Sequence, residues 1–229
     1  MLFSFAQQVN LFNKMLKTKI MASGINNLTD ARYFAAREVE WLGFRLDGSP
    51  TATISVLAAK AIAEWVDGVK IVGEFEFADA EEIAAANDLL HFDAVRVGMF
   101  TSPNELEKLP ALNFIKEVVV ENTTTEAEIV GHFREYEHCC AYFLLDFTKS
   151  GIGWAMLKGG GPFTLDFLTQ LFSKYQVILA LDFLPDEANE VLETLQPEGL
   201  SLAGGGEEKV GFKSFDEFDA ILDRLEVAV

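Results

Sequence analysis

Residues 69–99 read VKIVGEFEFADAEEIAAANDLLHFDAVRVGM and contain one copy of the repeating unit of the chain. The apolar run at 69–75 predicts a buried strand, and alanine, isoleucine and leucine then recur at helical spacing over 78–89. Residues 94–99 predict the next strand. A strand, a helix and a second strand in this order are typical of the parallel sheets of α/β proteins.

The same alternation continues through most of the sequence. We expect strands at 19–21, 41–46, 69–75, 94–99, 114–120, 140–146, 177–181 and 200–203. We expect helices from Asn27 to Val39 and at 54–66, 78–89, 104–109, 126–136, 164–172, 185–195 and 214–225, with a long loop between 146 and 162. Eight short, evenly spaced pairs predict a closed (β/α)8 TIM barrel over residues 17–229. A doubly wound sheet is the alternative, but residues 21–25 lack its glycine-rich turn.

The first sixteen residues precede this pattern. Their apolar side chains recur at helical spacing, at Phe5, Val9, Phe12 and Leu16. Polar residues interrupt the apolar run that a secretory signal requires. We therefore expect residues 1–16 to form an N-terminal helical extension, packed on the barrel or on a neighbouring subunit of a homodimer.

Composition limits the classes of partner. The 229 residues are 50% apolar, and 36 acidic against 18 basic residues give a formal charge of −18. A surface this acidic repels nucleic acids and anionic membranes, so we expect neither as a partner, and no apolar stretch has the length of a membrane span. A small ligand, including a phosphorylated sugar, remains compatible with this charge because a pocket sets its own local potential.

Cysteine usage predicts a reducing environment. Cys139 and Cys140 are sequence neighbours, which rarely reach disulfide geometry, and they begin an apolar run that predicts a buried strand. Reduced, buried thiols indicate a cytoplasmic protein. No cysteine and histidine spacing resembles a zinc site, so we expect neither a metal nor a cofactor.

In such a barrel the functional residues lie at the C-terminal ends of the strands. Asp146 ends an apolar strand, and burial raises the pKa of a carboxyl group, as a general acid near neutral pH requires. Anchoring of the following loop is an equally good interpretation of Asp146. Arg45 and Arg96 are candidate ligand-binding residues, although pairing with acidic neighbours such as Glu74 is the simpler interpretation.

Two glycine-rich stretches could hold an anion on their backbone N–H groups. Gly160 and Gly161 lie in the loop after the sixth predicted strand, and Gly204 and Gly205 follow the eighth. Barrels often bind phosphate with amides near the last two strands, and glycine lets an oxyanion approach closely. The carboxylate of Glu207 opposes that interpretation, and glycine triplets also form ordinary turns.

Several motifs together resemble the phosphoribosylanthranilate isomerase family. They are Lys19-Ile20 with GINNLTDA at 24–31, LGF at 42–44, VGEF at 72–75, FDAV at 92–95, LLD at 144–146, GGG at 159–161 and GFK at 211–213. The resemblance covers nearly all of the chain from about Met15. It implies a (β/α)8 barrel and an Amadori rearrangement in tryptophan biosynthesis, an intramolecular oxidoreductase-type isomerisation with Asp146 as the general acid.

The sequence departs from the family at several positions of the same site. Ser23 stands where the family has its catalytic cysteine base, and a hydroxyl is a much weaker acid than a thiol. Thr51 replaces the arginine that engages the substrate carboxylate, and Asp182 falls within the family's phosphate motif after strand seven. These differences favour a degenerate active site, repurposed toward another small molecule. A genuine isomerase using Asp146 and Ser23, and a barrel with a structural or interaction role, remain the alternatives.

Overall fold

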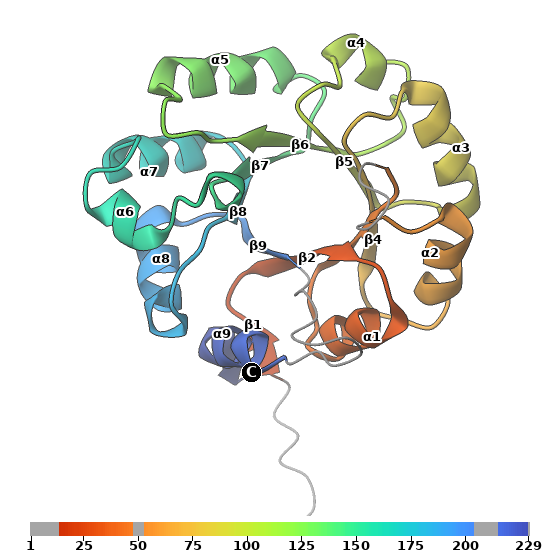
Figure 1. Ribbon diagram of the computed structural model, residues 1–229, viewed down its shortest axis with the longest axis horizontal. Helices are drawn as coiled ribbons and strands as arrows, with labels where there is room; N and C mark the ends of the chain where they lie inside the picture. The colour runs from red at the N-terminus through yellow and green to blue at the C-terminus, as the bar shows by residue number, and fades with distance from the viewer. Residues whose placement is uncertain (1–13, 48–52, 204–214, 229) are drawn as a thin grey trace, which may run out of the picture.

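Eight parallel strands close into a barrel in the computed structural model, which describes residues 14–47, 53–203 and 215–228 (Figure 1). The barrel strands are β2 (Lys19–Ile25), β3 (Trp41–Arg45), β4 (Lys70–Phe75), β5 (Ala94–Val97), β6 (Phe114–Val119), β7 (Tyr142–Asp146), β8 (Val177–Ala180) and β9 (Gly199–Ala203). Strand β9 pairs back onto β2, with Lys19 opposite Gly199. The expected (β/α)8 barrel is therefore confirmed.

A ring of helices surrounds the strands in Figure 1. They are α1 (Leu28–Ala36), α2 (Val56–Ala63), α3 (Ala80–Leu90), α4 (Pro103–Leu106), α5 (Glu126–Tyr136), α6 (Trp154–Lys158), α7 (Leu165–Lys174), α8 (Ala188–Leu195) and α9 (Asp216–Leu225). Local sequence fixes several helix starts: Asn27 caps α1, and Asp79 with Glu82 forms a capping box at α3. None of the described helices is long and apolar enough to cross a membrane.

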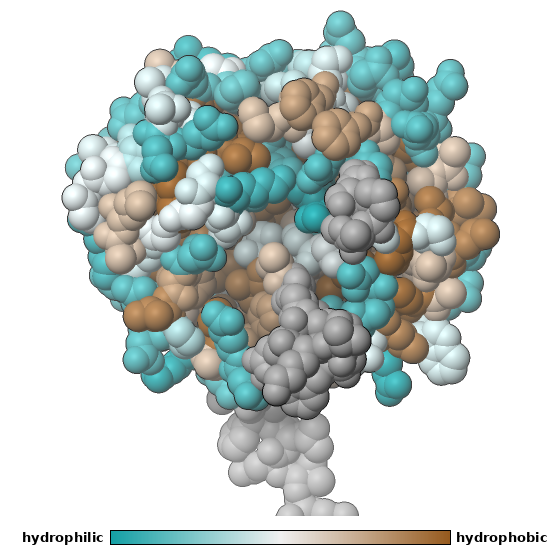
Figure 2. Space-filling view, viewed as in Figure 1, coloured by the Kyte–Doolittle hydropathy of each residue, from teal (hydrophilic) through white to brown (hydrophobic). Residues whose placement is uncertain are grey.

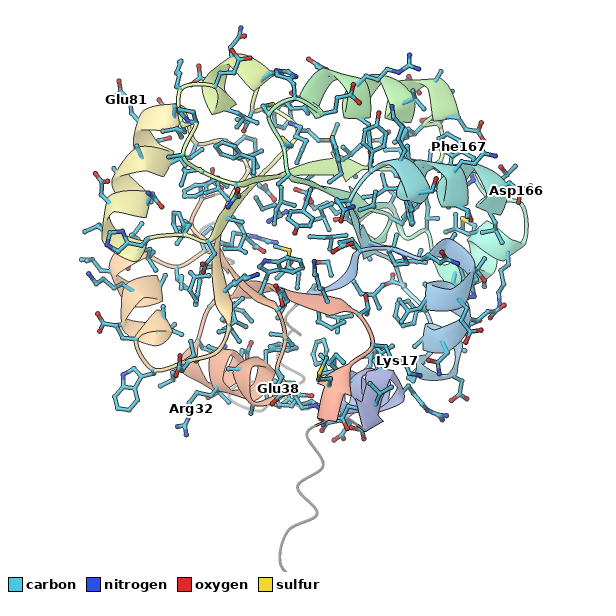
Figure 3. The ribbon with its side chains drawn as sticks, turned by 180° about the vertical axis from the view of Figure 1, so that it is seen from behind. Lys17, Arg32, Glu38, Glu81, Asp166 and Phe167 are labelled. Atoms are coloured by element: carbon cyan, nitrogen blue, oxygen red, sulfur yellow. The ribbon has the colours of Figure 1, made fainter. Side chains whose placement is uncertain are left out.

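The alternation of side chains along each strand produces two separate cores. The larger core lies between strands and helices and includes Phe34, Phe44 and Phe133. The smaller core fills the inside of the barrel with Met21, Trp41, Val72, Ala94, Ile115, Leu144, Ile178 and Ala180. Side chains occupy the space within the ring of strands when the barrel is seen from behind (Figure 3). The barrel is therefore a packed body, and a site must lie at one of its ends.

The N-terminal end of the barrel is closed by aromatic side chains. Trp41 and Tyr142 meet edge to face with ring centroids 5.5 Å apart. The ammonium group of Lys19 lies 5.7 Å from each of these ring centroids and pairs with Glu198. The C-terminal ends of the strands lie at the other end of the barrel, which we call the mouth.

Three expectations from the sequence need correction. The expected N-terminal helix lies outside the described residues up to residue 13, and at Lys14–Leu16 the chain is strand β1, which pairs antiparallel with β10 (Glu226–Ala228). Cys139 and Cys140 are half-buried and precede β7, because the strand begins only at Tyr142. The long loop after β7 contains a short 3-10 helix at Thr148–Ser150 and helix α6.

Candidate functional site in the mouth of the barrel

A layer of charged side chains lies directly above the inner core. Counting two residues onward from the inner-core residues of β4, β5, β6 and β7 leads to Glu74, Arg96, Glu117 and Asp146. All four are buried. Two-residue spacing keeps a side chain on the same face of a strand, so these four point into the barrel. Figure 2 shows hydrophilic side chains gathered around the centre of this end of the molecule.

Arg96 is held between two carboxylates. Its Nη1 lies 2.7 Å from Glu117 Oε2, and its Nη2 lies 3.2 Å from Glu74 Oε2. Burial opposes the charge on Arg96, but the carboxylates of Glu74 and Glu117 raise its pKa above the usual value. The ion pair considered for Arg96 and Glu74 is present, and it includes a second carboxylate.

Glu117 extends this cluster toward the loops. Lys149 Nζ lies 2.7 Å from Glu117 Oε1 and 3.6 Å from Glu76 Oε1. Burial raises the pKa of Glu117, but Arg96 and Lys149 outweigh burial and lower it overall. Glu117 was not among the candidate residues, because it lies within the predicted strand at 114–120 and not after it. Its two-residue spacing from Ile115 was the available signal.

Asp146 anchors the start of the loop that follows β7. Its Oδ1 accepts hydrogen bonds from the Thr148 backbone N–H at 2.8 Å, the Thr148 hydroxyl at 2.7 Å and the Lys149 backbone N–H at 3.1 Å. Asp146 is also among the groups that lower the pKa of Glu117. Asp146 is thus part of the charged cluster as well as an anchor for the loop.

Ser23 and Arg45 lie at the β2 and β3 side of the mouth. The hydroxyl of Ser23 is buried, 3.0 Å from that of Ser201. A side chain on Gly24 would place its Cβ 3.9 Å from Arg45 Nη2, and the Gly24 N–H donates to Glu74 Oε2 at 3.1 Å. The structure therefore brings Ser23, Arg45 and the Arg96 cluster to one end of the barrel.

Gly43 makes room for the side chain of Glu74. A Cβ atom built on Gly43 would lie 2.1 Å from Glu74 Oε1 and 2.7 Å from its carboxyl carbon. Real Cβ contacts are not this short, so any larger residue at 43 displaces Glu74. The LGF motif at 42–44 therefore supports the charged cluster directly.

The glycines after α6 serve as a helix cap. The Gly160 N–H donates to the Leu157 carbonyl at 3.3 Å, and the Gly161 N–H donates to the Met156 carbonyl at 3.0 Å. Gly160 has φ +90, which suits glycine at the end of a helix. Both amides are thus engaged within the chain. Gly204 and Gly205 lie outside the described residues.

On the barrel strands at the mouth, three buried polar atoms have neither a hydrogen-bond partner nor an ion-pair partner within the described part of the chain. They are Arg45 Nε, Glu74 Oε1 and Arg96 Nε. Unsatisfied buried polar groups are costly, and in native proteins a water or a ligand commonly satisfies them. The same described part contains no group of three or more histidine, cysteine or acidic residues that could hold a metal ion.

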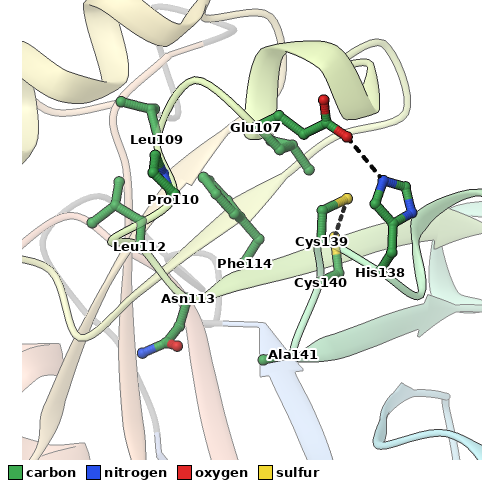
Figure 4. A pocket seen from close by; sticks show the side chains of 11 residues that line it. Glu107, Leu109, Pro110, Leu112, Asn113, Phe114, His138, Cys139, Cys140 and Ala141 are labelled. Atoms are coloured by element: carbon green, nitrogen blue, oxygen red, sulfur yellow. Dashed lines mark hydrogen bonds and ion pairs between the residues drawn. The ribbon is translucent and has the colours of Figure 1, made fainter.

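Two cavities lie at the opposite end of the barrel. The first, of about 540 Å³, is lined by the segments that lead into β6 and β7, including Cys139 and Cys140, and by Phe114 at the start of β6 (Figure 4). Burial raises the pKa of both thiols, so they are protonated, and their sulfur atoms are 4.0 Å apart. The second cavity, of about 430 Å³, lies between β1 and the segment before β9. Neither contains the charged cluster of the mouth.

Comparison with known proteins identifies relatives of this barrel, although no protein-family model matches the chain. An N-(5'-phosphoribosyl)anthranilate isomerase from a Synechococcus species is 28% identical over 216 residues, covering 88% of each chain. The crystal structure of phosphoribosyl anthranilate isomerase from Thermus thermophilus has a TM-score of 0.71 and 27% identity, covering 90% of this chain and 98% of the other.

A further solved phosphoribosyl anthranilate isomerase shares the fold at 19% identity. It has a TM-score of 0.71, and the match covers 91% of this chain and 98% of the other. That enzyme is in complex with reduced 1-(o-carboxyphenylamino)-1-deoxyribulose 5-phosphate. The family resemblance expected from the motifs is confirmed.

Proposed function

We propose that this chain, a divergent relative of the phosphoribosylanthranilate isomerase family, holds in its mouth a small ligand other than the phosphorylated substrate for which that family is named. The observation that carries the proposal is the clamp on Arg96. Both of its terminal nitrogens are engaged by Glu74 and Glu117 inside the chain. A guanidinium group whose charge is already matched by two carboxylates attracts a further carboxylate or phosphate only weakly.

The electrostatics of the mouth favour a neutral or positively charged ligand. The cluster joins four carboxylates, those of Glu74, Glu76, Glu117 and Asp146, to the two cations Arg96 and Lys149. Carboxylates in excess repel an incoming anion. The unpartnered polar atoms of Arg45, Glu74 and Arg96 offer hydrogen-bonding groups to a polar ligand.

The glycine cap also argues against the family's substrate. The ligand of the solved isomerase complex carries both a carboxyl group and a 5-phosphate. Here the amides of Gly160 and Gly161 donate to carbonyls of α6, and Asp182 adds a carboxylate shortly after β8. These features disfavour a phosphate near the loops of β7 and β8.

A genuine isomerase is the second candidate, and Asp146 is the observation that favours it. Its carboxyl group is buried at the end of β7, where the family resemblance places the general acid. Ser23, at the counterpart of the missing cysteine, would be the base. A barrel without catalysis is the third reading, since ion pairs occupy the mouth.

The thiol chemistry supports a cytoplasmic location for this function. Cys139 and Cys140 are free in the structure. Free thiols are stable in a reducing compartment, where intracellular biosynthetic enzymes also work.

Growth without tryptophan tests the proposal against the isomerase alternative. We expect the chain, expressed in a strain that lacks the isomerase, to give no rescue, and the pure protein to leave phosphoribosylanthranilate unconsumed. The double variant Ser23→Cys with Asp182→Gly restores a thiol and removes a carboxylate, so it should increase any residual activity. Robust rescue by the unaltered chain, abolished by Asp146→Asn, would establish the isomerase instead.

A further inference from the structure

Two exposed phenylalanines stack on each other at the rim of the mouth. Phe77 follows β4 and Phe100 follows β5, and their rings are 5.5 Å apart at an interplanar angle of 19°. Phe77 is 64% exposed and Phe100 is 79% exposed. Met99 beside them is 48% exposed. Large apolar side chains grouped in this way are often found at binding surfaces.

A carboxylate fixes the loop that carries Phe77. The two oxygens of Asp47 accept hydrogen bonds from three successive backbone N–H groups: from Glu76 at 2.6 Å, Phe77 at 2.7 Å and Ala78 at 2.8 Å. Three short, charge-assisted bonds hold this backbone in one conformation. The backbone that carries Phe77 is therefore fixed before any ligand arrives.

A buried lysine fixes the loop that carries Phe100. Lys116 Nζ donates to the carbonyl oxygens of Gly98 at 2.7 Å, Met99 at 3.3 Å and Thr101 at 3.1 Å. The hydroxyl of Tyr136 also donates to the Thr101 carbonyl, at 2.9 Å. The ammonium group of Lys116 therefore holds the residues on both sides of Phe100.

The stacked pair borders the acidic cluster. Glu76 precedes Phe77 directly, and its carboxylate faces Lys149 at 3.6 Å. The two loops also touch, because a Cβ atom on Gly98 would lie 3.0 Å from the backbone of Glu76. A ligand stacked on an outer face of this pair would thus have its other end near carboxylates.

We infer that Phe77 and Phe100 form a preformed aromatic platform, which binds the planar aromatic group of a ligand whose neutral or cationic end enters the acidic mouth. This inference rests on the proposed function and adds the ligand class. Aromatic rings prefer to stack on one another, and rings already held in place bind without an ordering cost. The excess of carboxylates selects against an anionic end.

Two fluorinated probes of matched size test both parts of the inference. Binding of 4-fluorophenethylamine, a cation, and of 4-fluorophenylacetate, an anion, is followed by fluorine NMR. We expect the amine to bind about tenfold more tightly, which corresponds to roughly 1.4 kcal/mol. Phe77→Ala and Phe100→Ala should each weaken amine binding about three- to tenfold, the range for one aromatic contact.

Trp65→Ala is the matched control. Trp65 is 72% exposed, follows the end of α2 away from the mouth, and should leave binding unchanged. Amine binding that keeps its preference over the anion but ignores both phenylalanine variants would reject the platform and leave the proposed function standing. Tighter binding of the anion would reject the proposed function itself. Absence of binding by either probe, or a change in oligomeric state on sedimentation of the phenylalanine variants, would also overturn the platform.

Discussion

Arg96 and Lys116 are buried cations on neighbouring strands, but they lie on opposite sides of the barrel wall. Arg96 on β5 points inward above the inner core, whereas Lys116 on β6 points outward beneath the loop after β5. Both are nearly inaccessible to solvent. Arg96 has its partners inside the mouth, whereas Lys116 has its partners in a loop at the rim of the mouth.

The two cations are compensated by different groups. Arg96 meets the carboxylates of Glu74 and Glu117, which raise its pKa despite burial. Lys116 meets backbone carbonyls and the ring of Tyr136, 4.1 Å from its ammonium group. Burial lowers the pKa of Lys116 to about 8, although Glu117 and Glu135 act in the other direction. Inside the barrel the cation is thus paired with charged carboxylates. Outside the barrel the cation is held by carbonyl dipoles and an aromatic ring.

This difference indicates different roles. Replacing a buried ion pair by apolar residues is often neutral or stabilising, so the cluster inside the barrel is weak evidence of a stability function. Its presence fits the ligand role proposed for the mouth. Lys116, which joins three carbonyls of one short segment, fixes loop geometry at the rim.

Removing Arg96 should have the largest effect on stability. Arg96→Met leaves Glu74 and Glu117 buried without their common partner, and we expect the free energy of unfolding to fall by about 3–5 kcal/mol. Urea unfolding measures this change. A loss below about 1 kcal/mol would mean that water already screens the cluster.

A triple variant separates the lost pairing from lost packing. Combining Arg96→Met with Glu74→Gln and Glu117→Gln removes the uncompensated charges together with the cation. We expect this variant to recover at least about half of the stability lost in Arg96→Met. A triple variant as unstable as the single one would assign the loss to packing of the arginine.

Gly43→Ala disturbs the same cluster from the neighbouring strand β3, and we expect a smaller loss of stability. Its Cβ atom would meet Glu74 Oε1 at 2.1 Å, so the carboxylate must move away from Arg96. We expect a loss of about 2 kcal/mol, in the range of overpacked cores. Gly131→Ala is the control: it lies in α5 with no atom within 4 Å of an added Cβ, and it should stabilise by up to about 1 kcal/mol. Equal effects of the two variants would show that Glu74 adapts freely.

Periodicity was sufficient to predict the architecture. In each strand and most helices, the local sequence pattern agrees with the element that forms. The barrel and most helix positions therefore follow from apolar spacing and from caps such as Asn27. Short elements were missed where the signal is weak: the five residues of α6 make little more than one turn, and β1 exists only through pairing with β10.

The partners within the mouth could not be predicted in the same way. Two-residue spacing could have placed Glu117 on the inner face, but its pairing with Arg96 depends on the stagger between β5 and β6. The glycines at 160 and 161 suggested an anion site, since sequence does not reveal which acceptor an amide meets. The three carbonyls that hold Lys116 are likewise a property of tertiary structure.

The pH dependence of stability that Lys116 produces should be the smallest of these effects. It tests whether a buried cation held by backbone carbonyls behaves differently from Arg96, which is held by carboxylates. The pKa of its ammonium group is lowered from 10.5 to about 8 in the folded chain. Between these values the unfolded chain binds a proton that the folded chain has lost, so stability contributed by Lys116 rises with pH. The shift corresponds to roughly 3 kcal/mol at most, and solvent screening reduces our expectation to about 1–2 kcal/mol.

The variant Lys116→Met isolates this contribution because all other titrating groups remain. We expect the difference in unfolding free energy, wild type minus variant, to stay flat below pH 8 and to increase from pH 8 to 10.5. A difference that instead decreases over this range would mean that the carbonyls and the Tyr136 ring stabilise the ammonium form more than burial opposes it. The barrel wall would then no longer separate two kinds of buried cation, since both would gain stability from their charge.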